Sequence, residues 1–420
     1  MNIRQPQLPK GWEIKKLSDV GKVFNGNSIN EKVKKDNYTD LDDGYPFIAT
    51  KDVGFDNEID YANGIKIPFT ERSQFKIAPS NTPLICAEGG SAGRKIGYTN
   101  QDVCFGNKLF AIIPNKDVDS KFIFYYYFNS TFQKHFSTGM AGIIGGVSMN
   151  KFKDIEIPLP PLPEQQRIVS ILDECFAAIA KAKANAEQNL KNAKELFNCV
   201  LDSILYDKKW QVKPLGDVCL RVEYGSSTKS TSEGKLPVLR MGNIQNRSFV
   251  WDSLVYSNNE EDNKQYLLKY NDVLFNRTNS PELVGKTAIY KSEMPAIFAG
   301  YLIRIHRKED LLDADYLNYY LNSKMAIEYG KTVVISSVNQ ANINGTKLKT
   351  YPIPLPSLKE QQIIVQKLDA LNAETKKLEA INHQKIKDLE ELKKSVLQKA
   401  FSGDLPTRQA GLKTEKAVMI

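Results

Sequence analysis

The sequence predicts an α/β (α+β) fold in which two α/β domains are separated by two long helices packed as an antiparallel coiled coil. Three observations lead to this prediction. A thirteen-residue motif occurs twice, each copy opens a long stretch of helical apolar periodicity, and each copy follows about 150 residues of mixed strand and turn character. We therefore expect an internal duplication with pseudo-two-fold symmetry.

The duplicated motif reads IPLPPLPEQQRIV from Ile157 to Val169 and IPLPSLKEQQIIV from Ile353 to Val365, with ten identical residues of thirteen. The start of each half repeats as well, because Trp12, Leu17, Asp19 and Val20 recur as Trp210, Leu215, Asp217 and Val218. Between these two repeats the halves share little sequence. We interpret this pattern as a duplicated scaffold of shared segments that carries two globular domains of different sequence.

Short apolar runs separated by Gly, Asn and Pro indicate strands and turns within each half, for example Leu84 to Cys86 and Val273 to Phe275. The aromatic run Tyr125 to Tyr127 could form a stacking platform for bases. We favour core packing of a helix, since the flanking residues are equally apolar. The expected boundaries are residues 1–157 and 208–352 for the domains, 158–207 and 353–403 for the helices, and 404–420 for an aperiodic tail.

The two long helices are predicted from their starts, their ends and their apolar spacing. Pro163 suits a first helical turn and no Gly or Pro follows before Pro214, whereas Ser357 with Glu360 forms a capping box and Gly403 ends the second helix. Isolated heptads favour dimerisation between chains, but two matching helices in one chain can pair internally. We expect packing through Ile168, Leu172, Ile179, Leu190, Phe197, Ile364, Leu368, Leu371, Leu378, Leu389, Leu392 and Val396.

Composition sets broad limits on the class of protein. Lys and Arg number 57 against 49 Asp and Glu, and the net charge of +8 favours an anionic partner without requiring one. The five cysteines show no CxxC pairing, so we expect neither a disulfide framework nor a zinc site, and a reducing cytoplasm as the location. The longest apolar run is far shorter than the roughly 20 residues that cross a bilayer, so we expect no membrane span.

Two clusters of residues could read DNA. Base edges in the major groove are recognised by Arg and Lys at guanine and by Asn and Gln at adenine. Any one such residue is more often a solvated surface group, but two clusters at corresponding places in a duplicated frame favour recognition. The candidates are Arg94, Lys95, Asn107 and Lys108 in the first half and Arg240, Asn243, Asn276, Arg277, Asn279, Lys286 and Arg304 in the second.

The sequence gives little support to catalysis by this chain. Val284 to Thr287 resembles the end of a phosphate-binding P-loop, but Ser280 and Pro281 stand where its first glycine is needed. The three histidines lack metal-ligand spacing. We therefore expect no catalytic residues, no metal and no cofactor in this chain.

The IPLPxLxEQQxIV motif, which opens a long helix twice in about 400 residues, resembles the specificity subunit of type I restriction-modification systems. The segments Glu88 to Arg94, Asn276 to Ser280 and Val284 to Lys286 look like parts of that family's target recognition domains. The first helix start departs from the pattern, because it lacks the Ser of the second capping box.

This resemblance implies a non-catalytic reader of double-stranded DNA whose two target recognition domains each bind half of a split, asymmetric site. It further implies that the helices set the spacing and dock two modification subunits carrying S-adenosylmethionine. Restriction subunits that use ATP and Mg²⁺ to translocate DNA join them in host defence. The alternative is a coiled-coil scaffold whose two domains bind partner proteins.

Overall fold

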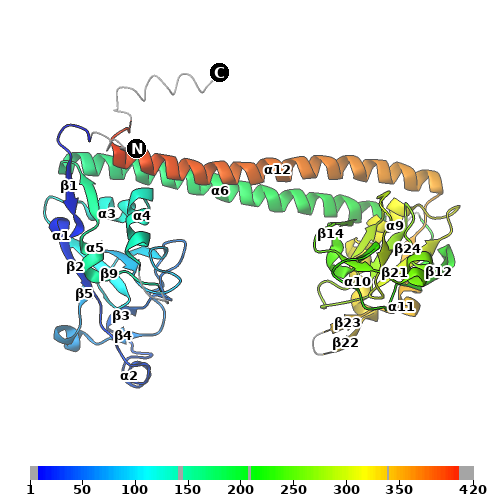
Figure 1. The fold of residues 1–420 in the computed structure, drawn as a ribbon, viewed down its shortest axis with the longest axis horizontal. Helices are drawn as coiled ribbons and strands as arrows, with labels where there is room; N and C mark the ends of the chain where they lie inside the picture. The colour runs from blue at the N-terminus through cyan, green and yellow to red at the C-terminus, as the bar shows by residue number, and fades with distance from the viewer. Residues whose placement is uncertain (1–7, 141–144, 207–209, 338–339, 406–420) are drawn as a thin grey trace. The chain divides into compact units, whose positions relative to one another are not determined.

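The computed structural model describes the chain except for residues 1–7, 141–144, 207–209, 338–339 and 406–420. It divides into two compact units, each made of one globular domain and a part of both long helices (Figure 1). Unit 1 comprises residues 1–185 and 385–420, and unit 2 comprises residues 186–384. The tail expected from residue 404 lies outside the described residues from 406 onward, and the predicted domain boundaries stay a prediction.

Two sheets form the domain of unit 1. The first is antiparallel, in the order β2 (Gly21–Asn25), β9 (Leu109–Pro114), β6 (Pro83–Cys86) and β7 (Ile96–Tyr98). The second has the order β4 (Lys66–Ile67), β3 (Tyr45–Ile48), β8 (Val103–Phe105) and β5 (Ile77–Ala78), with β3 and β8 parallel. Strand β6 is buried on both faces, because Leu84 belongs to one apolar cluster and Ile85 to another.

The helices of the domain in unit 1 close its larger apolar cluster. They are α1 (Leu17–Val20), α3 (Ser120–Tyr126), α4 (Ser130–Gly139) and α5 (Met149–Lys153), with α2 (Glu31–Asn37) and the 3₁₀ helix η1 (Phe69–Gln74) elsewhere in the domain. Tyr125, Tyr126 and Tyr127 are buried in this cluster, so the expectation of core packing is confirmed. An antiparallel ribbon of β1 (Glu13–Lys16) and β10 (Glu156–Leu159) leads into the first long helix.

Unit 2 repeats the same plan. Its main sheet has the order β12 (Cys219–Tyr224), β21 (Leu302–Arg307), β17 (Val273–Asn276) and β19 (Thr287–Ile289). The second sheet has the order β16 (Val255–Ser257), β13 (Leu236–Leu239) and β20 (Ile297–Phe298), with β13 and β20 parallel. The corresponding ribbon pairs β11 (Val212–Pro214) with β24 (Pro352–Pro354).

The remaining elements of unit 2 include the counterparts of the helices in unit 1. The helices are α7 (Leu215–Val218), α8 (Glu260–Gln265), α9 (Ala314–Leu321), α10 (Lys324–Val333), α11 (Gly345–Lys349) and η2 (Met241–Asn243). The small strands are β14 (Ile244–Gln245) with β15 (Ser248–Phe249), and β18 (Thr278–Asn279), β23 (Gln340–Asn342) and β22 (Ile335–Ser337).

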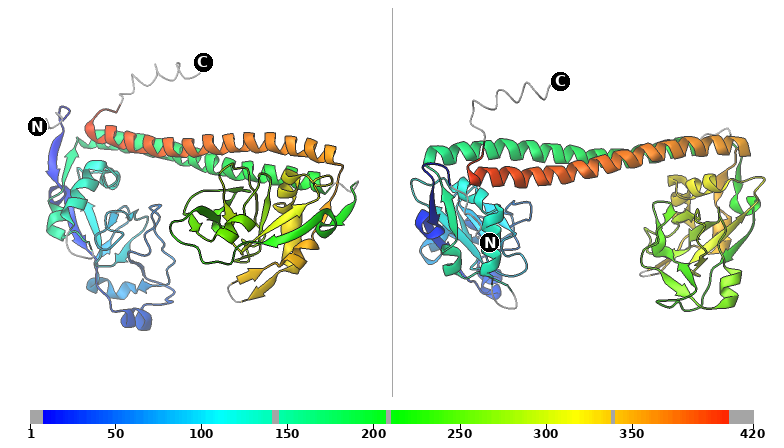
Figure 2. Two further views of the ribbon diagram at one scale, coloured as in Figure 1. Left: turned by 45° about the vertical axis from the view of Figure 1, so that its right-hand side comes forward. Right: turned by 45° about the horizontal axis from the view of Figure 1, so that its top comes forward.

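The long helices α6 (Leu162–Leu205) and α12 (Leu358–Ser402) pair with opposite chain directions within each unit (Figure 2). In unit 1 the start of α6 shares its apolar cluster with the end of α12, and Leu172 and Phe401 are members of it. In unit 2 the end of α6 shares a cluster with the start of α12, including Phe197 and Leu368. The expected fold class is therefore confirmed. No described helix is both long and apolar enough to cross a membrane.

The apolar stripe of α12 differs in part from the expected one. Leu378 and Leu392 are 47% and 48% exposed, whereas Thr375 and Asn382 are buried. A straight helix drifts by about 20° per heptad against a strict seven-residue repeat, so a leucine series can rotate out of the seam. Of the other expected packing residues, Ile168, Leu172, Ile179, Phe197, Ile364 and Leu368 are buried, and Leu190, Leu371, Leu389 and Val396 are partly buried.

Candidate nucleic-acid interface

A glutamine of each EQQ motif joins its long helix to the domain of the same unit. The fully buried Gln165 donates through Nε2 to Pro160 O at 2.8 Å and to Asp117 O at 3.1 Å, and its Oε1 accepts from Asp119 N at 2.8 Å. Asp119 caps the N-terminus of α3. The glutamine thus connects the first turn of α6 to the start of a domain helix.

Unit 2 contains the same arrangement. Gln361 donates to Leu311 O at 2.8 Å and to Pro356 O at 3.0 Å, and it accepts from Asp313 N at 2.8 Å at the N-terminus of α9. The sequence repeat contained this glutamine, but its spacing alone did not reveal its partners at Leu311 and Asp313, which lie 50 and 48 residues away.

A tyrosine on the domain reinforces each junction. Tyr319 on α9 donates its hydroxyl to Asp369 on α12 at 2.5 Å, and Tyr125 on α3 donates likewise to Asp173 on α6. Burial and the neighbouring carboxylate both raise the pKa of each tyrosine, so both hydroxyls are neutral donors at physiological pH. Both domains are therefore fixed to their helices by equivalent contacts.

The first candidate cluster lies on a turn that follows β6. Gly89 and Gly93 have φ angles of +81° and +70°, which glycine adopts without strain, and the turn between them presents Arg94 to solvent. The Arg94 guanidinium lies 5.0 Å from the ring centroid of Phe55, and Lys95 Nζ lies 5.3 Å from the same centroid. Phe55 is 60% exposed, so two cations and an aromatic ring share one open patch.

A second turn of unit 1 lies beside this patch. Asn107 and Lys108 are exposed between β8 and β9, and Lys108 O accepts from Ala87 N at 2.9 Å, at the start of the glycine turn. The structure therefore brings all four candidates of the first half to neighbouring turns at one end of the main sheet. A protein surface of this kind can contact phosphates and base edges together.

Arg277 is the centre of the second cluster and also stacks on an aromatic ring. Its guanidinium lies 4.9 Å from the centroid of Tyr224, and Nη1 donates to Gly300 O at 3.3 Å. Its Nε is buried and has no hydrogen-bond partner among the described residues. Asn279 and Lys286 are partly exposed on the loop that Asn276 closes, since Gly285 N donates to Asn276 O at 2.8 Å.

Three expected contact residues of unit 2 lie inside the fold. The buried Asn243 and Asn276 donate to backbone oxygens of neighbouring loops, at Asp252 and Leu283. Arg304 is also buried and forms ion pairs with Glu223 at 2.6 Å and Asp272 at 2.9 Å. These partners occupy donors that a base contact would need. Arg240, which is partly exposed, donates through Nη2 to Ser253 O at 2.8 Å.

Glu223 is the acceptor at the centre of this internal network. Burial alone would raise its pKa, but hydrogen bonds from His306 and Arg304 outweigh that effect and lower it. The carboxylate is therefore charged at neutral pH and balances the buried guanidinium. The network holds β12 against β21 in the main sheet of unit 2.

Sequence reasoning missed the aromatic partners Phe55 and Tyr224. A signal was present for Phe55, which is a lone aromatic residue between Gly54 and Asp56 in a polar stretch. An aromatic residue in such a setting has little core to enter and is a candidate for surface contacts. Tyr224 gave no comparable signal, because it ends an ordinary strand.

Comparisons with known proteins show which family this chain resembles over its length. A family model described as the type I restriction modification DNA specificity domain matches residues 9–191 and again residues 207–390. The specificity subunit of the type I restriction enzyme EcoKI from Escherichia coli (strain K12) is 26% identical over 423 residues, which cover 95% of this chain and 90% of that protein. The StySPI specificity subunit of Salmonella potsdam is 25% identical, over 96% and 91% of the two chains.

Two solved structures share the fold. One comes from work on complex assembly and conformational transition of a type I restriction-modification system, with a TM-score of 0.77 at 19% identity over 95% of this chain and 100% of that one. The other is the HsdS subunit of Thermoanaerobacter tengcongensis, with a TM-score of 0.62 at 20% identity over 96% and 100%.

Proposed function

The chain belongs to the type I restriction-modification DNA specificity family, and from this membership we propose that it reads a bipartite, asymmetric DNA site for a type I complex. Unit 1 and unit 2 each recognise one half of the site. The observation that carries this proposal is the pair of equivalent helix junctions at Gln165 and Gln361, which hold two domains with different surface loops. Two domains that are joined to their helices in the same way but differ in their surface loops suit two half-sites of different sequence.

The proposed contacts are the exposed or partly exposed candidates of each unit. Arg94 and Arg277 are the strongest, because stacking on Phe55 and Tyr224 restricts each guanidinium while leaving donors free for an acceptor. Lys95, Lys108 and Lys286 supply positive charge for phosphates. Asn107, Asn279 and Arg240 are further candidates for base edges, whereas the buried Asn243, Asn276 and Arg304 support the loops that carry them.

The chain is proposed to act without catalysis of its own, in the cytoplasm. Methyl transfer belongs to two modification subunits with bound S-adenosylmethionine, and ATP-dependent translocation and cleavage belong to restriction subunits. The paired helices are the proposed docking platform for the modification subunits. The half-exposed side chains of Leu378 and Leu392 on α12 provide apolar surface for such contacts.

Sequencing of methylated bases tests the proposed function. A host that carries this chain together with its neighbouring modification subunit should acquire methylation at a sequence split into two unlike halves by a nonspecific spacer. Methylation at a continuous sequence, or none with a complex that assembles normally, would contradict the proposal.

Salt dependence separates this function from that of a protein scaffold. Binding that neutralises phosphates weakens steeply with salt, because bound cations are released from the duplex. The complex with its modification subunits should therefore lose affinity for a duplex by about a thousandfold or more between 50 and 200 mM salt, if six or more phosphates are contacted. A protein scaffold would not bind the duplex at either salt concentration.

A further inference from the structure

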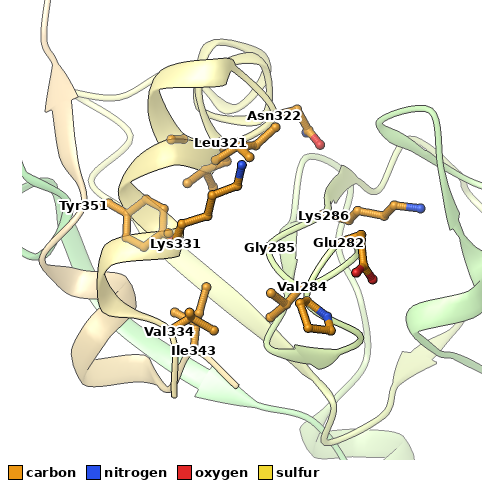
Figure 3. Close-up of a pocket in the computed structure, with 14 residues that line it drawn as sticks. Glu282, Val284, Gly285, Lys286, Leu321, Asn322, Lys331, Val334, Ile343 and Tyr351 are labelled. Carbon is orange, nitrogen blue, oxygen red and sulfur yellow. The ribbon is translucent and has the colours of Figure 1, made fainter. Parts of the chain in front are cut away.

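Unit 2 contains a cavity of about 510 Å³ beside α10 (Figure 3). Its walls are α10, the loop that precedes β19, the end of α9 and Tyr351. Val284, Leu321 and Ile343 give these walls an apolar character, and Lys286 and Lys331 lie at their edges. The volume falls within the range of about 300–1,000 Å³ that is usual for small-molecule sites.

The duplication explains why the cavity exists. Helix α4 of unit 1 and helix α10 of unit 2 each have ten residues and start 194 residues apart (324 minus 130). In this register Ala326 of α10 corresponds to Phe132 of α4, and Gly330 corresponds to Phe136. Two phenyl rings of unit 1 are therefore absent from the same place in unit 2.

In unit 1 these two rings are packed into the core of the domain. Phe132 and Phe136 are fully buried, with ring centroids 5.8 Å apart and 6.3 Å and 6.2 Å from that of Phe152. Phe136 lies so close to Gly93 that a Cβ at that glycine would approach its ring to 2.8 Å. Unit 2 has neither ring, and the Tyr351 hydroxyl reaches the place beside Gly330 where the Phe136 side chain begins in unit 1.

Tyr351 supplies a polar group to this cavity. It corresponds to Ile155 of unit 1, 196 residues earlier, and it is only 2% exposed. Its hydroxyl forms no hydrogen bond within the part of the chain that the structure describes. A Cβ on Gly330 would lie 2.7 Å from this oxygen, so glycine is needed for the hydroxyl to reach its position. Burial raises the pKa of Tyr351, which keeps the hydroxyl neutral and able to donate.

The charges around the cavity favour an anion. Lys331 stands where unit 1 has Ser137, and Lys286 lies on the opposite wall. Neither lysine forms an ion pair with any described carboxylate, and Glu282 is the acidic residue among those that line the cavity. Two ammonium groups against one carboxylate leave a net positive edge.

We propose that unit 2, and not unit 1, binds a small aromatic anion in this cavity. Its rings occupy the space beside Ala326 and Gly330, an acceptor atom takes the hydrogen bond of the Tyr351 hydroxyl, and its anionic group lies near Lys331. Nothing in this proposal depends on DNA reading. A failure to bind the anion would leave the proposed function untouched.

Isothermal titration calorimetry of the full chain with biphenyl-4-carboxylate tests the site. Two linked phenyl rings and a carboxylate match the two missing rings and the positive edge. We expect saturable binding of one molecule per chain, and binding of the neutral biphenyl-4-methanol at least fivefold more weakly. Lys331→Ser, which introduces the residue of unit 1, should weaken carboxylate binding severalfold and leave binding of the alcohol unchanged.

A double variant fills the cavity in the way that unit 1 does. Gly330→Phe with Tyr351→Ile recreates the pair Phe136 and Ile155, and it should abolish binding while Ser137→Lys in unit 1 changes nothing. If the double variant does not fold, two single variants replace it. Ala326→Phe should abolish binding by filling the cavity, and Lys331→Ser should weaken binding of the carboxylate. Absence of saturable binding, two sites per chain, or equal binding by a folded filled variant would overturn the proposal.

Discussion

The side chain of Gln361 accepts a hydrogen bond from the backbone N–H of Asp313 at 2.8 Å, and Gln165 accepts one from Asp119 at the same distance. In both units the acceptor is an amide oxygen in the first turn of a long helix, and the donor is the N-cap of a domain helix. The glutamine amide nitrogens satisfy two carbonyl oxygens each. These contacts set the angle at which each domain leaves its helix.

Replacement of Gln361 by Leu should destabilise unit 2 by at least ~2 kcal/mol. It leaves one N–H and two carbonyl groups without partners, and each buried unsatisfied group costs about 1–3 kcal/mol. The free energy of unfolding in urea measures the effect. Gln362→Leu, at the exposed neighbouring position, is the matched control and should change stability by less than ~0.5 kcal/mol. If both substitutions lowered the free energy of unfolding equally, the hydrogen bonds of Gln361 would not be what stabilises the junction.

Glu223→Gln should destabilise the chain in a pH-dependent manner. Breaking a buried ion pair costs about 3–5 kcal/mol near pH 7, because Arg304 is left with one carboxylate fewer. The pKa of Glu223 is lowered in the fold from 4.5, so the stability it provides is present above that pH and is lost as the pH falls through the folded-state pKa.

The stability difference between the parent chain and Glu223→Gln should therefore shrink when the pH is lowered from 5 to 3. Urea unfolding across that range measures it, with Glu309→Gln as an exposed control. A difference that stays constant or widens toward pH 3 would contradict the assigned network.

Arg94→Ala should weaken DNA binding by the complex. The losses of affinity for cognate and for random duplexes together show whether Arg94 contacts a base or a phosphate. Loss of a contact to a base costs ~1–3 kcal/mol on the cognate duplex and relaxes one position of the site, whereas loss of a phosphate contact weakens cognate and random duplexes alike. Arg277→Ala is predicted to act in the same manner on the other half-site. Binding to both duplexes distinguishes the outcomes.

A control for Arg94 is available at the opposite end of the same sheet. Lys116 is exposed just after the end of β9, while the glycine turn lies at the start of that strand, so Lys116→Ala should leave both affinities unchanged. If Arg94→Ala behaves like Lys116→Ala on both duplexes, Arg94 makes no contact with DNA.

Four residues inserted near Ala186 in α6 should lengthen the spacer of the recognised site by one or two base pairs. The insertion adds about 6 Å at about 1.5 Å per residue, against about 3.4 Å per base pair, and it preserves the apolar stripe better than two residues would. The half-sites themselves should stay the same. Sequencing of methylated sites measures the spacer. An unchanged spacer in an active complex would show that the helices do not set the distance.

The sequence allowed the frame to be predicted more fully than the site. The repeated motif and the apolar spacing gave the two helices and the duplicated domains, because both features are local. Arg304 could not be assigned in this way, since its partners Glu223 and Asp272 lie 81 and 32 residues away on other strands or turns. The exposure of Leu378 depends on helix drift, which an apolar pattern does not show. The cavity at Gly330 is lined by residues from α9, α10, the loop before β19 and Tyr351, which the sequence alone does not bring together.

The most direct test of the central claim is an exchange of one reader. Residues Gly11 to Glu156 would be replaced by the corresponding segment of a relative with a different methylation site, and the methylated bases would be sequenced in the host. We predict that one half of the recognised sequence changes while the other half and its spacer are retained. A change in both halves, or in neither, would contradict two independent readers.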